Sequence, residues 1–503
     1  MAFKNAMLSD TTTFNENGAL SYTSTGDARV DFFTMIVRDS SNQDLIIPVL
    51  HRAWMKDPLD TLKLIFQKRD CRGGVGEKDV FYHSMIWLWT HHPKVFMHNI
   101  KHIPEYGSYK DWCKLVEFDH SVRYIIAAEF AKQLKLDHNQ EGNSISLCAK
   151  YAPSEKKSFD KKIPGFVNII ARKFSPNHAC NKDYRNCLSE LRHKINIVEK
   201  QMCFNNWEDI DYSSVPSVAL KKYANAFKKH NQEGYENWLT KVISGEAKLN
   251  ASQLQPHEIA GKYFGDWGYL QATTEDELTE AQWGVMIDDT MGLGDFSKCV
   301  AMPDMSGSMS GLPMNVAATL SILIAKVAQR QESLFGNMVI SFSEKPHFLQ
   351  LDESDSLLAN INILTNGETN GFSTDLYHAF SIMIDKAIQS DVSQEDFPEK
   401  LIILTDMQFD EVTGHVPQRL DMIDHIDGLF DTSPYNRPEI VCWNLRSTGN
   451  VVSTCDRPGL SLVSGFSKDT FKNIMNNEYT TTTPYDIMRY AIDDERYDRL
   501  TLP

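Results

Sequence analysis

The fold of the second half of this chain is decided by residues 299–309, which read Cys-Val-Ala-Met-Pro-Asp-Met-Ser-Gly-Ser-Met. The apolar run at 299–302 leads directly into a polar turn, and a long amphipathic segment follows at 313–331. Continuous apolar strands that alternate with amphipathic helices predict a mainly parallel sheet covered on both faces. We therefore predict an α/β domain here, because five more apolar runs follow: 338–342, 348–351, 401–404, 440–443 and 460–463.

Oxygen-bearing side chains follow two of these predicted strands. Asp304, Ser306 and Ser308 come directly after the first run, and Asp406 comes after the run at 401–404. In a parallel sheet, ligands bind beyond the carboxyl ends of the strands, so these groups are expected to lie close together. Between them, residues 369–375 offer a further hydroxyl from Thr374, with Ser373 as the neighbouring alternative.

Two carboxylates and three hydroxyls are the hard oxygen ligands that Mg²⁺ or Mn²⁺ prefers, and the lack of nearby His or Cys argues against zinc. A simpler reading is that Asp304 and Ser306 only cap the following helix, and the two roles are compatible. The predicted metal ligands are Asp304, Ser306, Ser308, Thr374 and Asp406.

The first half has a different pattern, in which apolar residues recur at helical spacing from residue 44 onward. We expect two helices interrupted at Pro58, and further helices at 122–136, 181–204 and 216–229. Many short helices separated by Pro and Gly suggest stacked helical pairs. The predicted organisation is a polar, loop-like segment at 1–28, a helical-repeat domain at 29–290 and the α/β domain at 298–503.

Charge is divided unevenly between the two halves. The whole chain has a formal net charge of −16, yet residues 51–250 hold 32 Lys and Arg against 23 Asp and Glu. Residues 298–503 hold 15 Lys and Arg against 29 Asp and Glu. This asymmetry suggests that the two halves face different partners, with the basic half able to attract polyanions, although a solvated surface with chance bias explains it equally well.

The densest basic stretch, at residues 156–173, is a candidate phosphate-binding surface. The alternative interpretation is that this stretch is only a solvated loop. Arg185 and Arg192 lie seven residues apart, close to two helical turns, so they are expected on one helix face. His178, Cys180, Cys187 and His193 could be imagined as zinc ligands, but Cys187 follows core spacing and is better explained as a buried thiol. The candidate RNA-binding residues are Lys156, Lys157, Lys161, Lys162, Arg172, Lys173, Arg185 and Arg192.

Two further features bound the location and the chemistry. No run of eighteen apolar residues and no secretory signal is visible, and nine cysteines are scattered without C-x-x-C spacing, so we expect a cytoplasmic protein with reduced thiols and no membrane contact. The sequence Gly73-Gly-Val-Gly-Glu-Lys78 lacks the spacing of a phosphate-binding loop and predicts a tight turn between helices.

Two resemblances extend this reading. Asp304-Met-Ser306-Gly-Ser308, with Thr374 and Asp406, resembles the metal-ion-dependent adhesion site of von Willebrand factor A domains. Residues 69–77 and 103–112 resemble signatures of TROVE-type helical repeats, which are HEAT-like, and further similarity continues at 184–192, 198–199 and 215–217. The chain thus resembles the TROVE-like plus von Willebrand A proteins of plants, fungi and large DNA viruses, distant relatives of the Ro ribonucleoprotein autoantigens.

The resemblance implies a ring of helical repeats that binds RNA and a second domain that binds an acidic protein side chain through Mg²⁺. It also implies association with the virion if the source is a large DNA virus. We expect a non-enzymatic binding or scaffold protein, because no nucleophile and base form a recognisable pair. The alternative is a structural or assembly protein that makes only protein–protein contacts.

Overall fold

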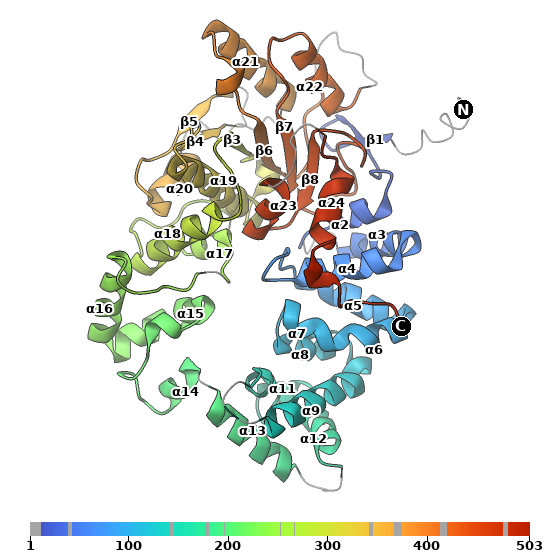
Figure 1. The fold of residues 1–503 in the computed structure, drawn as a ribbon, viewed down its shortest axis with the longest axis vertical. Coiled ribbons are helices and arrows are strands. Elements are labelled where there is room, and N and C mark those ends of the chain that lie inside the picture. The colour runs from blue at the N-terminus through green and yellow to red at the C-terminus, as the bar shows by residue number, and fades with distance from the viewer. Residues whose placement is uncertain are drawn as a thin grey trace.

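A computed structural model describes the following residues of the chain: 12–38, 43–140, 142, 145–176, 181–195, 197–251, 253–265, 267–341, 346–366, 375–412, 420–475 and 481–503. The described residues form a helical part and a six-stranded sheet (Figure 1).

The sheet has the strand order β5-β4-β3-β6-β7-β8. All neighbours pair in parallel except β4 and β5, which pair antiparallel at one edge. The prediction of a mainly parallel sheet is confirmed, and each of the six apolar runs forms a strand. These strands are β3 (Cys299–Pro303), β4 (Met338–Ile340), β5 (Phe348–Gln350), β6 (Lys400–Thr405), β7 (Glu439–Asn444) and β8 (Leu460–Ser464).

Both faces of the sheet are buried, which is why β6 and β7 are apolar at every position between their end residues rather than at alternate ones. One face packs with α21 and α22 into its own core, to which Ile403 and Cys442 contribute. The opposite face, including Ile402 and Trp443, belongs to a larger core that continues into the helical part. The helices of this region are α19 (Leu312–Arg330), α20 (Leu357–Asn366), α21 (Leu376–Gln389), α22 (Met422–Asp431), α23 (Phe471–Met475) and α24 (Pro484–Ile492).

Helix α19 is the central helix of that larger core. It is the one helix in the described part of the chain that is long and apolar enough to cross a bilayer, but 83% of its most apolar stretch is buried inside the protein. It contacts β3, β4, β6, α17, α18 and α20. Its apolarity is therefore that of a helix buried on most sides.

The helical part is built from short helices, as the sequence predicts. The interruption at Pro58 is confirmed, since one helix ends at Lys56 and the next begins at that proline. The single helix expected at 181–204 is wrong: it ends at Lys194, where Ile195 has extended backbone angles, and a second begins at Val198. These helices are α2 (Ala28–Met35), α3 (Gln43–Lys56), α4 (Pro58–Arg69), α5 (Asp79–His91), α6 (Pro93–Asn99), α7 (Ile103–Tyr106), α8 (Tyr109–Phe118), α9 (Arg123–Asn139), α10 (Cys148–Tyr151), α11 (Ser158–Lys162), α12 (Phe166–Phe174), α13 (Lys182–Lys194), α14 (Val198–Cys203), α15 (Ser217–His230), α16 (Gln232–Ile243), α17 (Pro256–Ala260) and α18 (Glu277–Met291).

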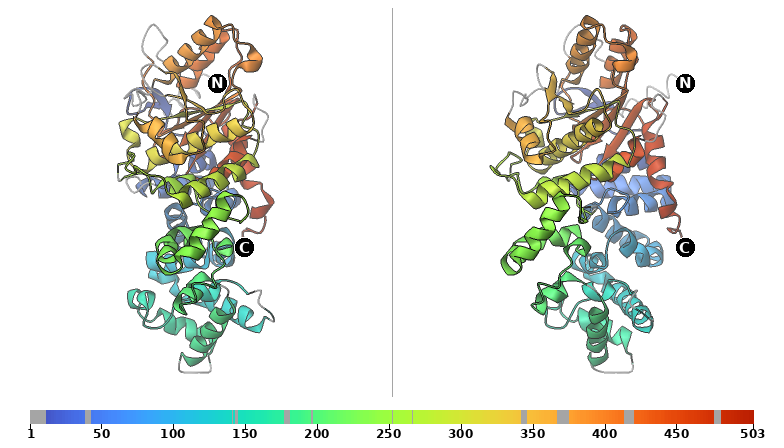
Figure 2. Two further views of the ribbon diagram at one scale, coloured as in Figure 1. Left: turned by 90° about the vertical axis from the view of Figure 1, so that its left-hand side faces the viewer. Right: turned by 60° about the vertical axis from the view of Figure 1, so that its left-hand side comes forward.

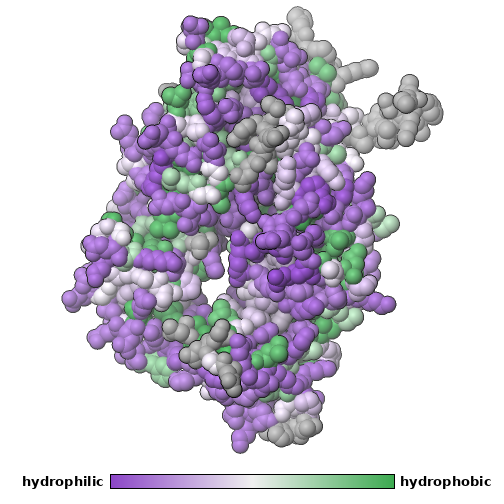
Figure 3. Space-filling model, viewed as in Figure 1, coloured by the Kyte–Doolittle hydropathy of each residue, from purple (hydrophilic) through white to green (hydrophobic). Residues whose placement is uncertain are grey.

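The helical part curves away from the sheet and returns to it. Helices α3–α9 run down one side, α11–α13 lie at the far end, and α14–α18 come back up the other side (Figure 1). The side views show the sheet at one end of the long axis and α9, α12 and α13 at the other (Figure 2). In the space-filling view, the background is visible through a narrow opening near the middle of the molecule (Figure 3). The helical part and the sheet together therefore surround an opening.

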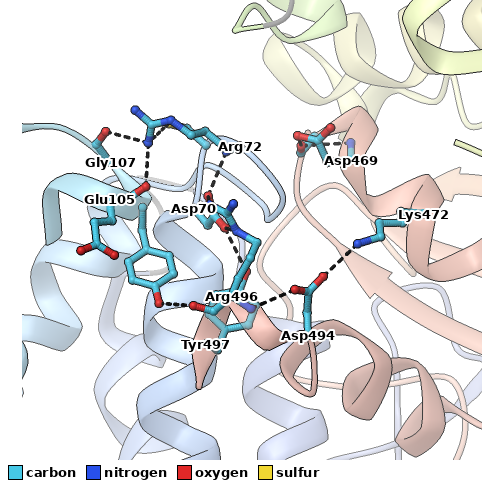
Figure 4. Close-up of polar contacts among 12 residues, drawn as sticks. Asp70, Arg72, Glu105, Gly107, Asp469, Lys472, Asp494, Arg496 and Tyr497 are labelled. Atoms are coloured by element: carbon cyan, nitrogen blue, oxygen red, sulfur yellow. Dashed lines mark hydrogen bonds and ion pairs between the residues drawn. The ribbon is translucent and has the colours of Figure 1, made fainter. Parts of the chain in front are cut away.

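The two ends of the described chain each pack against a distant segment. Residues expected to be loop-like form a hairpin, β1 (Thr12–Phe14) with β2 (Leu20–Tyr22), which pairs with residues that follow β6 and β7. At the other end, Arg496 and Tyr497 both donate to the buried carboxylate of Asp70, which ends α4 (Figure 4). The hydroxyl of Tyr106 donates in turn to the carbonyl of Arg496, at 2.6 Å. The carboxyl-terminal segment thus fastens the sheet part to the helical part.

Candidate metal centre

The candidate site begins where β3 and β6, which are neighbouring strands, end. The ladder continues one residue past β3, because the backbone N–H of Asp304 donates to the carbonyl of Leu404 at 2.9 Å. Asp406 follows β6 directly, so the two carboxylates leave adjacent strands at the same edge of the sheet. Both are almost fully buried.

Hydrogen bonds fix the carboxylate of Asp304 in place. Its Oδ1 accepts the backbone N–H of Ser306 at 2.9 Å, and its Oδ2 accepts the hydroxyl of Thr405 at 2.9 Å. Burial and the nearby charge of Asp406 raise its pKa to about 6, against which these hydrogen bonds act. A carboxylate that is both buried and faced by a second one is costly to ionise without a cation, so the pair favours a bound positive charge.

The two serines bring their hydroxyls to the same place. Oγ of Ser306 and Oγ of Ser308 lie 3.0 Å apart, within hydrogen-bonding distance. Ser306 is buried, whereas Ser308 is exposed, so the site opens to solvent on the side of Ser308. A guanidinium N–H of Arg446, just beyond β7, donates to the backbone carbonyl of Ser308.

These groups fit a hard divalent cation in their chemistry. Two carboxylates and two hydroxyls supply only oxygen, the donor type of Mg²⁺ and Mn²⁺ sites. No group of three His, Cys, Asp or Glu side chains arranged to hold a metal occurs within the described residues, so the hydroxyls are essential to any such site. Thr374, the third predicted hydroxyl, and the alternative Ser373 lie outside the described residues.

Sequence reasoning did not find two of the supporting residues. Thr405 holds Asp304 through its hydroxyl, and its position at the end of the strand, beside Asp406, was an available signal. Arg446 had none, because only the pairing of β6 with β7 brings it near the loop that follows β3.

The candidate RNA-binding residues gather at the end of the molecule farthest from the sheet. They lie on or next to α11, α12 and α13, three helices that are close together in Figures 1 and 2. Lys156, Lys157 and Lys161 are exposed, as are Arg172 and Lys173. The structure therefore brings most of the predicted basic residues to one region.

Three of these residues also make contacts within the protein. Lys162 pairs with Glu117 at 2.9 Å, and Arg185 pairs with Glu155 at 2.7 Å. The guanidinium of Arg192 donates to the carbonyls of Ala149 and Ala152 and to the hydroxyl of Ser154, at 2.7–2.8 Å. Arg185 and Arg192 thus point toward the same segment, as their spacing predicts, and Arg192 braces the loop that follows α10.

The alternative phosphate and zinc sites receive no support from the geometry. Residues 73–78 join α4 to α5 as the predicted tight turn, in which the backbone N–H groups of Val75 and Glu77 donate to carbonyls of α4. Cys187 is buried in the core, as predicted. His178 and Cys180 lie outside the described residues, and the cysteines within them are all free thiols.

The fold and the site define a two-part class of protein. A helical part curves back to a mainly parallel sheet, and two carboxylates and two hydroxyls lie at one edge of that sheet. Residues 15–123 and 105–296 match a family described as a domain of unknown function, DUF2828. The chain therefore belongs to the DUF2828 family. Residues 298–498, which hold the sheet and the candidate site, match a second domain of unknown function, DUF7788.

A viral relative matches nearly the whole chain. The uncharacterized protein L728 of Acanthamoeba polyphaga mimivirus is 31% identical over an alignment of 501 positions, which covers 92% of this chain and 85% of that protein. The similarity thus spans both the helical part and the sheet.

Proposed function

We propose that the chain is a non-enzymatic binding protein whose sheet part binds an acidic protein ligand through Mg²⁺ or Mn²⁺. In this proposal the sheet part is a von Willebrand A-like domain, and its candidate metal centre is an adhesion site of that type. One observation carries the proposal: Asp304, Ser306, Ser308 and Asp406 place hard oxygens at one solvent-accessible edge of the sheet. The bound ion would offer the ligand's carboxylate a positive charge and a replaceable water position.

The residues of the chain have distinct roles in this binding. Asp304 and Asp406 would balance the charge of the ion, directly or through water, and Ser306 and Ser308 would ligate it without adding charge. Thr405 would keep Asp304 aimed at the centre, since its hydroxyl already holds one carboxylate oxygen. Because the two hydroxyls add no negative charge, the ion would remain electrophilic enough to accept a carboxylate from an acidic ligand.

Calorimetric titration of Mg²⁺ tests this function. The wild-type chain should bind the ion, Asp406→Asn should bind it at least tenfold more weakly, and Ser308→Ala should also weaken binding. Ser310→Ala is the matched control, because this hydroxyl lies two residues away and donates to the carbonyl of Gly307 instead. Equal affinities in wild type, Asp406→Asn and Ser308→Ala would refute the metal centre.

We further propose that the helical part is a TROVE-like domain that binds RNA, as in Ro-type proteins. The supporting observation is the group of exposed basic residues on and around α11 and α12, together with the opening that the molecule surrounds. Phosphate contacts release counterions, so affinity for single-stranded RNA should fall steeply as salt rises from 50 to 200 mM. Replacing Lys156, Lys157, Lys161, Arg172 and Lys173 with Gln should weaken binding and flatten that salt dependence. An absence of binding at 50 mM salt would instead favour an assembly protein that contacts only other proteins.

A further inference from the structure

A hollow of about 290 Å³ lies beside the candidate metal centre, between the helical part and the sheet part. On the helical side its wall includes Ile46 of α3 and Val80 of α5. On the sheet side it includes Leu312 at the start of α19 and Leu445 just after β7. It is therefore formed only when the two parts of the chain pack together.

The hollow shares its wall with the candidate metal centre. Leu445 donates its backbone N–H to the carbonyl of Thr405, the residue before Asp406, at 2.9 Å. Arg446, which also lines the hollow, donates to the carbonyl of Ser308. Leu312 follows Ser308 by only four residues. A ligand at the metal centre could thus extend into the hollow within a few residues, since an extended chain advances about 3.3–3.6 Å per residue.

The lining favours an apolar side chain. Apart from two arginines and Asp79, the wall is made of aliphatic side chains, Pro313 and Phe466. Arg38 lies 4.9 Å from the ring centre of Phe466, and its Nε pairs with the buried carboxylate of Glu77 at 2.9 Å, so its charge is already balanced inside the protein. The volume is near the lower limit of ligand pockets, roughly 300 Å³, and suits one large side chain rather than a larger molecule.

We propose that this hollow is the second contact of the acidic protein ligand. The ligand would be an extended segment whose carboxylate binds at the metal centre and whose leucine-, methionine- or phenylalanine-like side chain, a few residues away, fills the hollow. Charge complementarity supports a single ligand at the metal centre and in the hollow. The cation and Arg446 attract the acidic end of such a segment, and the hollow covers its apolar end. This inference rests on the proposed function of the metal centre.

Selection from a display library of nonapeptides with a fixed central Asp tests the proposal on the full-length chain. Peptides are bound in Mg²⁺ and eluted with EDTA, and the enriched sequences should share a large apolar residue at one fixed offset from the Asp. The affinity of an enriched peptide for the Leu312→Gln variant should then fall at least tenfold. Leu334→Gln is the control, because Leu334 is also exposed but does not line the hollow.

The outcomes separate this inference from the function on which it rests. Mg²⁺-dependent enrichment of acidic peptides with no apolar preference, or equal affinity for wild type and Leu312→Gln, overturns the two-point contact and leaves the metal centre standing. Enrichment that EDTA does not reverse, or no enrichment at all, overturns the proposed metal-dependent function and the inference with it.

Discussion

His257 of α17 is a buried histidine with an unusually low pKa. Its ring packs against Phe466 at 5.4 Å between centroids, and no hydrogen-bond partner for its Nδ1 occurs in the described part of the chain. Burial, with smaller effects from Arg38 and Lys221, lowers its pKa to about 3. Between pH 6.5 and 3 the unfolded chain therefore takes up a proton that the folded chain does not, so this residue makes the protein less stable as pH falls.

We predict that His257→Gln reduces the acid sensitivity of the protein. With an unfolded pKa near 6.5, this histidine should lower the free energy of unfolding by about 1.4 kcal/mol between pH 7.5 and pH 5.5. Urea unfolding of both proteins at the two pH values measures the effect. The fall in stability should be smaller in the variant by about that amount, and an equal fall in both proteins would contradict the role of His257.

The turn between α4 and α5 depends on close approach of its backbone to the preceding helix. A Cβ atom on Gly74 would lie 2.3 Å from the carbonyl oxygen of Gln67, which is part of the backbone and has little room to move. On Gly73, the nearest atoms would be 3.4 Å away and belong to the flexible side chain of Arg496. The two adjacent glycines therefore differ sharply in what they tolerate.

We predict that Gly74→Ala lowers the free energy of unfolding by about 2 kcal/mol or more, as overpacking in a well-packed site does. Gly73→Ala, the matched control, should change it by less than about 0.5 kcal/mol. Chemical unfolding followed by tryptophan fluorescence measures both. Similar losses in the two variants would show that the contact with Gln67 does not limit the turn.

The regular elements of the sheet were predictable because their signal is local. Each central strand is buried on both faces, so the positions between its end residues are all apolar and the run is visible without knowing its partners. The ends of the chain gave no such signal. The strands β1 and β2 have only three residues each, and their hairpin is stabilised by contacts almost 400 residues away in sequence, such as that of the side-chain amide of Asn15 with the carbonyl of Phe409.

The positions of four candidate metal ligands were predictable for a similar reason, since each follows a strand directly in sequence. Asp304, Ser306 and Ser308 follow one strand in sequence, and the rule for parallel sheets was enough to bring Asp406 to the same edge. The contribution of Arg446 and the hollow beside it could not be predicted. Both depend on how β7 and the helical part pack against the loop after β3, which no local pattern records.

At the scale of the whole molecule, the carboxyl-terminal segment joins two parts that also share one hydrophobic core. Asp70 is fully buried at the end of α4 and pairs with Arg496, at 2.7 Å. The ring of Tyr497 stacks on that of Tyr106, with centroids 5.5 Å apart. Arg499, two residues after Tyr497, pairs with Glu105 on the exposed surface. One pair thus balances a buried charge, whereas the other is solvated.

We predict that Arg496→Ala lowers the free energy of unfolding by about 2 to 3 kcal/mol, because it leaves the carboxylate of Asp70 buried without its cation. Arg499→Ala should change stability by less than about 1 kcal/mol, as exposed ion pairs do. Combining Arg496→Ala with Asp70→Asn removes the uncompensated charge, so the double variant should lose less than the sum of the single losses. Urea unfolding of wild type, Arg496→Ala, Asp70→Asn and the double variant closes this cycle, and Arg499→Ala is measured beside them. Because the hydrophobic core is continuous, the loss should appear as a shift of the whole unfolding transition. Additive losses in the double variant, or equal effects of Arg496→Ala and Arg499→Ala, would show that the attachment of the carboxyl-terminal segment does not depend on the charge of Asp70.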